Sequence, residues 1–196
     1  PGGILASFGQ RFGYELNGVD FIADPADIEG YLKSLSLRVG SIERADALTW
    51  EPSRKFDIVG SFGFIEHFEN ALEIADRHFR LVKPGGHVTI TMPNFARGQW
   101  ILHRIFDAAQ LAVHNTKIMN LRFFREVALR NRATLLHSAY AGGHFEFWPD
   151  HSERPPLVKK AMWRTANFAK RVLRRLPGKT NPFFSPYLIS VFRAPE

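Results

Sequence analysis

The chain has 196 residues, of which 45% are hydrophobic and 23% charged, so it has enough apolar material for a folded core and is not disordered as a whole. It has no cysteine, which excludes disulfide frameworks, thiol nucleophiles, iron–sulfur clusters and cysteine-based zinc sites. The formal net charge of +7 is concentrated in one segment, because residues 151–180 hold nine Lys and Arg against one Glu.

Helices and strands alternate along the first part of the chain. Asp24 followed by Pro25 is typical of a helix start, and Lys83–Gly86 is a turn signal before a strand. The residues at 56–61 are apolar enough for a buried strand. In chain order we expect a helix at 4–12, a strand at 16–19, a helix at 24–35, strands at 39–44 and 56–61, a helix at 70–79 and a strand at 87–92.

The remaining chain continues this alternation. We expect one long helix at 99–113, a helix at 121–131, a strand at 133–140, a basic helix at 156–176 and a last strand at 187–192. Strands that alternate with helices predict an α/β fold with a mostly parallel sheet covered on both faces.

Polar residues and glycines follow the expected strands, where an open α/β sheet binds its ligand. Gly2 and Gly3 open the first helix, whose N-terminus favours an anion. Asp20 ends the first strand, and a carboxylate there can accept hydrogen bonds from both hydroxyls of a ribose. Asp46 can accept from an adenine amino group, and Phe21 can form an apolar wall for the ring. The pattern indicates a nucleoside ligand.

Five short stretches add to this pattern: NGVD at 17–20, ADA at 45–47, FDIV at 56–59, FIEHF at 64–68 and LVKPGG at 81–86, the last followed by a strand and Pro93-Asn94. With these stretches in this order, the chain resembles the class I S-adenosylmethionine-dependent methyltransferases, especially the group near the quinone-biosynthesis methyltransferases. The resemblance covers roughly residues 1–140, with a weaker similarity around the last strand.

The resemblance implies a Rossmann-like, doubly wound sheet, mostly parallel with an antiparallel last strand. It implies a single methyltransferase domain over 1–196, with 1–140 as the cofactor-binding core and 151–180 as a basic helical insertion. It also implies that the first strand of the family precedes Pro1, so the chain as given is expected to lack part of the glycine-rich loop and to be impaired in activity.

The cofactor implied by the resemblance is S-adenosylmethionine. The resemblance assigns its binding to Gly2 and Gly3 (methionine end), Asp20 (ribose), Phe21 (adenine face), Asp46 and Ala47 (adenine edge), and Ser61 and Phe62 (sulfonium).

His67 and Glu66 are the predicted catalytic residues. The sulfonium donor is already activated, so the protein mainly positions the reactants, and a hydroxyl acceptor also needs a base. An imidazole can act as a base near neutral pH, which makes His67 the leading candidate, and Glu66 can orient it or accept the proton itself. The alternative is that both residues only fix their loop by hydrogen bonds. His114 and His144 are interpreted as cap or loop residues.

No metal is expected. Some quinone O-methyltransferases hold a divalent ion with a Glu followed three residues later by a Glu-His pair. Here the pair is Glu66 and His67, but the earlier position is Gly63, and the other histidines have no convincing ligand spacing.

The basic segment admits three interpretations. As a helix, it places apolar side chains along one side, at Val158, Met162, Thr165, Ala169, Val172 and Leu176. It docks on the sheet with a solvated basic face, lies in the interface of an anionic membrane, or binds an acidic glycan. Nucleic acid is not an expected partner, because no base-stacking platform or RNA-binding module accompanies the charge.

The sequence therefore predicts methyl transfer from S-adenosylmethionine to a small-molecule, lipid-linked or glycan-linked acceptor, by a cytoplasmic protein that is free or associated with a membrane surface. One alternative is a nicotinamide-dependent Rossmann oxidoreductase, which shares the glycine loop and Asp20. Another is a non-catalytic methyltransferase-like module that docks on anionic membrane.

Overall fold

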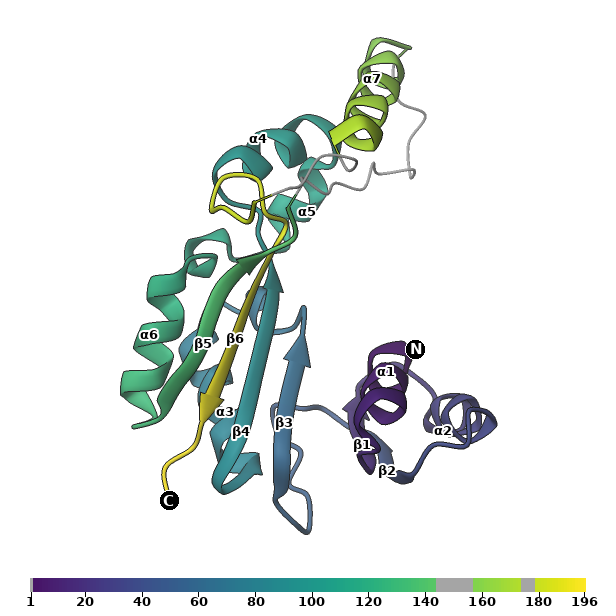
Figure 1. Cartoon of the computed structure of the whole chain (residues 1–196), viewed down its shortest axis with the longest axis vertical. Helices are drawn as coiled ribbons and strands as arrows, with labels where there is room; N and C mark the ends of the chain where they lie inside the picture. Colours follow the sequence, from purple (N-terminus) through teal and green to yellow (C-terminus); the bar gives the residue numbers. More distant parts are fainter. Residues whose placement is uncertain (1, 144–156, 174–178) are drawn as a thin grey trace. The chain divides into compact units, whose positions relative to one another are not determined.

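The computed structural model describes residues 2–143, 157–173 and 179–196, and the chain divides into two compact units (Figure 1). The N-terminal unit spans Pro1–Ser53 and the C-terminal unit spans Arg54–Glu196.

The N-terminal unit is a short parallel pair of strands with two helices. The strands β1 and β2 pair so that Asp20 lies opposite Arg44, which brings their carboxyl ends to one edge. The second helix begins where the sequence predicts, because the Asp24 carboxylate accepts a hydrogen bond from the backbone N–H of Ala26 and Pro25 occupies the first turn. The elements are α1 (Gly3–Phe12), β1 (Leu16–Asp20), α2 (Pro25–Ser34) and β2 (Val39–Arg44).

One apolar core joins both helices to the strands of this unit. Ala6 of α1, Ile28 and Leu32 of α2, and Leu16 and Ile42 of the strands are all buried in it.

The C-terminal unit contains a four-stranded sheet in the order β3-β4-β6-β5. Its elements are β3 (Phe56–Phe62), η1 (Ile65–His67), α3 (Ala71–Leu81), β4 (Val82–Pro93), α4 (Arg97–Phe106), α5 (Ala108–Ala112), η2 (Thr116–Ile118), α6 (Leu121–Arg130), β5 (Thr134–Ala141), α7 (Leu157–Leu173) and β6 (Tyr187–Arg193).

The last strand, β6, runs antiparallel to both of its neighbours, whereas β3 and β4 are parallel. Leu188, Ser190 and Phe192 of β6 are fully buried, as expected for a strand inside a sheet. The mostly parallel Rossmann-like sheet with an antiparallel last strand is therefore confirmed. The predicted strand before Pro1 stays a prediction.

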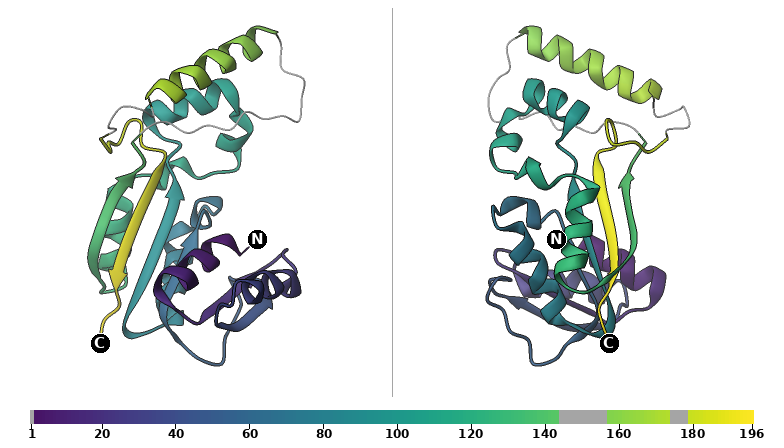
Figure 2. Two further views of the ribbon diagram at one scale, coloured as in Figure 1. Left: turned by 45° about the vertical axis from the view of Figure 1, so that its right-hand side comes forward. Right: turned by 90° about the vertical axis from the view of Figure 1, so that its left-hand side faces the viewer.

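Helices α3 and α6 lie together on one face of this sheet (Figures 1 and 2). The Asn120 side chain caps α6 by accepting from the backbone N–H of Phe123, and Phe124 packs edge-on against Phe192 of β6. Helices α4 and α5 follow the carboxyl end of β4 (Figure 1), which is the edge where the predicted catalytic residues follow β3.

Two predicted elements differ from the structure in their bounds. The expected single helix at 99–113 is broken at Asp107, whose backbone (φ −152°, ψ 54°) leaves the helical region and whose carboxylate binds the His103 ring. The strand expected at 87–92 spans Val82–Pro93, because Phe56 pairs with Val82 before the register shifts to Ile58 and His87.

Within the described residues, no helix is both long enough and apolar enough to cross a membrane.

Candidate functional site

The carboxyl edge of the N-terminal unit carries Asp20 at the end of β1. Oδ1 of Asp20 accepts hydrogen bonds from the backbone N–H groups of Ile22 and Ala23, both at 2.8 Å, and these bonds lower the pKa of the carboxyl below its usual value. The other oxygen, Oδ2, has no hydrogen bond among the described residues. The carboxylate is thus held in a fixed orientation, ionised and exposed, with one oxygen available to a ligand.

Three further predicted cofactor residues, Phe21, Asp46 and Ala47, follow the two strands of this unit. Phe21 and its neighbour Ile22 are exposed at 69% and 80%, so apolar surface faces solvent next to the carboxylate. Asp46 follows β2, and its side chain accepts from the backbone N–H of Leu48, which closes a turn that includes Ala47. The backbone N–H of Ala45 donates to the Asp20 carbonyl, so the two strand ends are joined directly.

Gly2 and Gly3 form the start of α1. Gly2 has φ +85°, and a Cβ there would lie 3.2 Å from a methyl of Ile28 and 3.4 Å from the Tyr31 ring. A Cβ on Gly3 would meet nothing within 4 Å, so the backbone of the first helical turn is open to approach. This helix start therefore lies beside α2 within the N-terminal unit, and glycine at position 2 is required by both conformation and space.

The C-terminal unit carries the other predicted residues, at the end of β3. Ser61 has a buried Oγ without a hydrogen-bond partner among the described residues, and Phe62 is 38% exposed. Gly63 follows with φ +66°, and its N–H donates to the carbonyl of Thr91. A Cβ at this position would lie 3.3 Å from Oε1 of Glu66.

Glu66 lies in η1 and is 1% exposed. Its Oε2 has no hydrogen-bond partner among the described residues. Burial disfavours the carboxylate and raises the pKa of Glu66 to about 7. A buried carboxyl group with an unused oxygen, next to a loop at a strand end, is typical of a site that awaits a ligand or a proton.

His67 is exposed, and its ring is oriented by the backbone. Its Nδ1 lies 3.1 Å from the carbonyl of Val113, and because a carbonyl only accepts, Nδ1 carries the proton. The neutral ring then presents Nε2 as a lone pair. The sequence left two roles open for His67, base and loop anchor. This geometry is compatible with both, because Nδ1 anchors the loop and Nε2 is left to act as the base.

His114 lies against His67, which the sequence did not predict. The two ring centroids are 4.4 Å apart, and Nδ1 of His114 lies 2.6 Å from the carbonyl of Gln110. Burial lowers the pKa of His114. One ligand atom from each of Glu66, His67 and His114 lies within 4.8 Å of the others, so these residues form a donor set that fits a divalent cation. His144 lies outside the described residues.

The structure thus divides the predicted residues between the two units. Gly2, Gly3, Asp20, Phe21, Asp46 and Ala47 belong to the N-terminal unit, and Ser61, Phe62, Glu66 and His67 belong to the C-terminal unit. Within each unit these residues lie at strand ends, except Gly2 and Gly3, which open α1.

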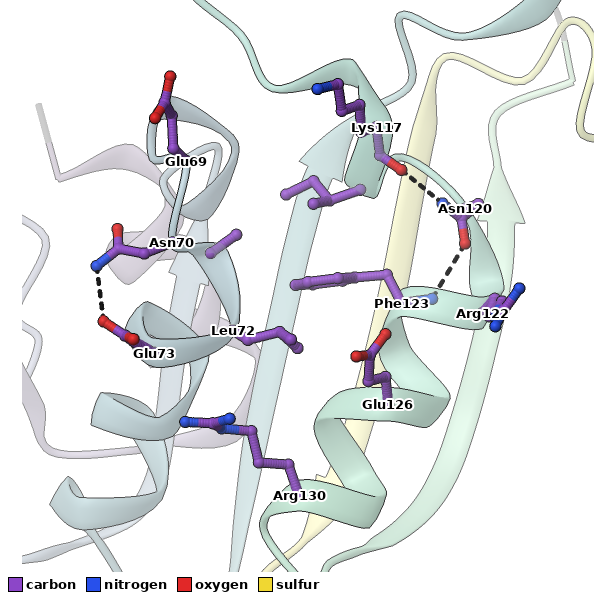
Figure 3. Close-up of a pocket in the computed structure, with 12 residues that line it drawn as sticks. Glu69, Asn70, Leu72, Glu73, Lys117, Asn120, Arg122, Phe123, Glu126 and Arg130 are labelled. Atoms are coloured by element: carbon purple, nitrogen blue, oxygen red, sulfur yellow. Dashed lines mark hydrogen bonds between the residues drawn. The ribbon is translucent and has the colours of Figure 1, made fainter.

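A separate groove of about 510 Å³ lies between α3 and α6 (Figure 3). None of the predicted site residues lines it. Acidic and basic side chains line it, Asn70 donates to Glu73, and Asn120 caps α6. None of its lining side chains is among the buried polar groups that lack a hydrogen-bond partner in the described residues.

Helix α7 falls within the predicted basic segment. Met162, Phe168 and Val172 are exposed apolar residues, and the basic residues Arg164 and Arg171 are exposed as well. The predicted ends of this helix, 156 and 174–176, lie outside the described residues.

Known proteins share this fold. The topology defines a Rossmann-like α/β class. The methyltransferase domain family matches residues 1–151, and the chain therefore belongs to this family, within the class I S-adenosylmethionine-dependent methyltransferases. This membership decides against the nicotinamide-dependent oxidoreductase alternative.

Curated proteins are similar to this chain over about half of its length. The ubiquinone biosynthesis O-methyltransferase of Proteus mirabilis (strain HI4320) is 27% identical over 111 residues, which cover 52% of this chain and 42% of that protein. The chain spans less than half the length of the curated relatives it matches.

Solved structures share the fold. A candidate methyltransferase from Bacillus halodurans C-125 has a TM-score of 0.65 at 15% identity, covering 100% of this chain and 89% of that one. The N-methyltransferase NodS from Bradyrhizobium japonicum WM9, solved in complex with S-adenosyl-L-homocysteine, has a TM-score of 0.56 at 12% identity, covering 100% and 74%.

Proposed function

We propose that this chain binds S-adenosylmethionine and transfers its methyl group to a hydroxyl of a small-molecule or lipid-linked acceptor. Family membership supports the reaction class, and the two sets of strand-end residues supply the chemistry that it needs. The observation that carries the proposal is the pairing of a buried, partly unpartnered Glu66 with an oriented His67 after β3.

The cofactor is assigned to the edge that holds Asp20. The free Oδ2 of the Asp20 carboxylate accepts from the ribose hydroxyls, and Phe21 contacts the adenine ring. The adenine edge is assigned to Asp46 and the Ala47 backbone. Gly2 and Gly3 leave the start of α1 accessible to the carboxylate of the methionine moiety, which the positive end of the helix favours. Ser61 and Phe62 are assigned to the sulfonium.

The acceptor is assigned to the loop that holds Glu66 and His67. Methyl transfer to a hydroxyl oxygen forms the C–O bond as the C–S bond breaks, and the hydroxyl proton must leave. The Nε2 lone pair of His67 accepts that proton, while the Nδ1–H bond to Val113 holds the ring in place. Glu66 stabilises the imidazolium that forms.

The two curated relatives favour an oxygen acceptor. Both curated relatives are ubiquinone biosynthesis O-methyltransferases, and each is 27% identical to this chain over about half of it. A phenolic hydroxyl on a ring that carries an apolar tail is therefore the acceptor class we favour.

A labelled-donor assay tests this proposal. The full chain is incubated with methyl-labelled S-adenosylmethionine and a soluble catechol, as wild type, His67→Gln and His87→Gln. His87 is an exposed histidine near the start of β4 and serves as the matched control. We expect His67→Gln to slow transfer by about 10²- to 10⁴-fold, as for loss of a general base. Equal rates in the two variants would remove His67 from the mechanism.

A second proposal concerns α7, which we assign to an anionic membrane surface. Exposed Phe168 and Met162 beside exposed Arg164 and Arg171 form the apolar and basic surface that such docking needs. Co-sedimentation with vesicles that contain anionic lipid tests it. Binding by the wild type that is lost in Arg164→Glu/Arg171→Glu supports docking, and sedimentation unchanged by the substitutions contradicts it.

A further inference from the structure

Three potential metal ligands meet in the C-terminal unit, although they come from two separate loops. Glu66 and His67 belong to η1, and His114 follows α5. One ligand atom of each lies within 4.8 Å of the others. We propose that Glu66, His67 and His114 form a binding site for a divalent transition-metal cation, in which His114 supplies the third ligand.

Both imidazoles are held in the protonation pattern that a metal ligand requires. Nδ1 of His67 donates to the carbonyl of Val113, and Nδ1 of His114 donates to the carbonyl of Gln110. Each neutral ring therefore exposes the lone pair of Nε2. A backbone carbonyl that fixes one ring nitrogen is the usual support behind a histidine ligand, because it sets both the tautomer and the ring orientation.

The third donor is a buried carboxylate oxygen without a partner. Glu66 is 1% exposed, and its Oε2 has no hydrogen bond among the described residues. A buried oxygen of this kind is costly unless something binds it. The same loop has no side chain at Gly63, so the space beside Oε1 of Glu66 is left open.

The two loops are fastened to each other independently of any ion. The backbone N–H of Asn115 donates to the Glu66 carbonyl at 2.6 Å, and its side-chain amide donates to the Phe68 carbonyl at 3.1 Å. Phe95 packs edge-on against the His114 ring, with centroids 4.8 Å apart. These contacts hold the three donors together before a ligand arrives, which reduces the ordering needed for binding.

The donor set selects the kind of ion. Two imidazole nitrogens and one carboxylate oxygen suit Zn²⁺, Co²⁺ and their neighbours, whereas Mg²⁺ and Ca²⁺ prefer oxygen ligands alone. Three protein ligands also leave a coordination position for water or for an acceptor oxygen.

The metal site adds detail to the proposed acceptor site. Only the catalytic role of the ion rests on the proposed function, and metal binding itself does not. A bound divalent cation supplies Lewis-acid activation of a hydroxyl oxygen. While His67 ligates the ion, its Nε2 lone pair is unavailable for the acceptor's proton. In the ion-bound form Glu66, His67 and His114 would hold the ion, and in the ion-free form His67 remains the base of the proposed function.

Titration of the full, chelator-treated chain with CoCl₂ tests the site directly, by calorimetry and by the visible absorption of bound Co²⁺. We expect equimolar, saturable binding that ZnCl₂ displaces and that excess MgCl₂ leaves intact. His114→Phe keeps a ring against Phe95 and removes the ligand, so it should weaken Co²⁺ binding by about tenfold or more, as should Glu66→Gln. His87→Phe, on β4, should bind as the wild type does.

Two results would overturn the inference. One is the absence of equimolar Co²⁺ binding by a wild-type chain whose circular dichroism spectrum is that of a folded α/β protein. The other is equal Co²⁺ affinity in His114→Phe and His87→Phe. Titration of the same samples with S-adenosyl-L-homocysteine reports cofactor binding separately, so failure of the metal site is distinguishable from failure of the proposed methyl transfer.

Discussion

Asp20 is the residue on which cofactor binding is expected to depend most. We consider Asp20→Asn, which keeps Oδ1 as the acceptor for the backbone N–H groups of Ile22 and Ala23. The substitution replaces Oδ2 by an amide nitrogen, which cannot accept from the ribose hydroxyls. The turn after β1 should therefore survive while the ligand contact is lost.

The size of the effect follows from the bond that is removed. A hydrogen bond to a charged acceptor contributes about 1.5–3 kcal/mol. At about 1.4 kcal/mol per tenfold change, the dissociation constant for S-adenosyl-L-homocysteine should rise by about 10- to 150-fold.

Isothermal titration calorimetry with S-adenosyl-L-homocysteine measures this change. Asp27→Asn is the matched control, because Asp27 is exposed in the first turn of α2 and the substitution removes the same charge from the same unit. Equal dissociation constants in the two variants would refute the ribose assignment and would reduce the role of Asp20 to holding its own turn.

Three predictions test the fold that positions these residues. Phe192→Ala should lower the free energy of unfolding by about 3–5 kcal/mol in chemical denaturation, because the ring is fully buried in the middle of the sheet; a loss below about 1 kcal/mol would contradict the packing of β6. Gly98→Ala should lower the Tm, since its Cβ would lie 2.8 Å from the Phe183 carbonyl, whereas Gly30→Ala in open space on α2 should raise it; shifts of the same sign would be inconsistent with the structure. Burial lowers the pKa of His78, so the unfolded chain takes up a proton that the folded chain resists, and stability should fall as the pH drops below about 6.5. His78→Gln should flatten that dependence of Tm on pH, and an unchanged slope would show that His78 is not responsible.

Local signals in the sequence predicted most of the elements. Asp24-Pro25 marks the start of α2 because both residues act within one turn. The strand β6 was predicted from its apolar run, and its antiparallel direction from the family resemblance. The break between α4 and α5 was missed because the helical periodicity of the sequence continues through Asp107, whose backbone leaves the helical region.

The candidate site, too, could be predicted from the sequence only in part. Glu66 and His67 are adjacent in the sequence, and a motif identifies them. His114 joins them only through hydrogen bonds between segments 46 and 47 residues apart, so its position required the structure. Asn115, the next residue, caps the start of η2 with its side chain. Its backbone and side-chain amides also anchor the His114 loop to η1.

The central claim is that this chain uses S-adenosylmethionine. Equilibrium dialysis of the wild-type chain against labelled S-adenosylmethionine, with unlabelled S-adenosyl-L-homocysteine or NADH as competitor, tests that claim most directly. Saturable binding that S-adenosyl-L-homocysteine displaces and NADH leaves unchanged is the predicted result. Displacement by NADH, or no saturable binding by the folded chain, would contradict it.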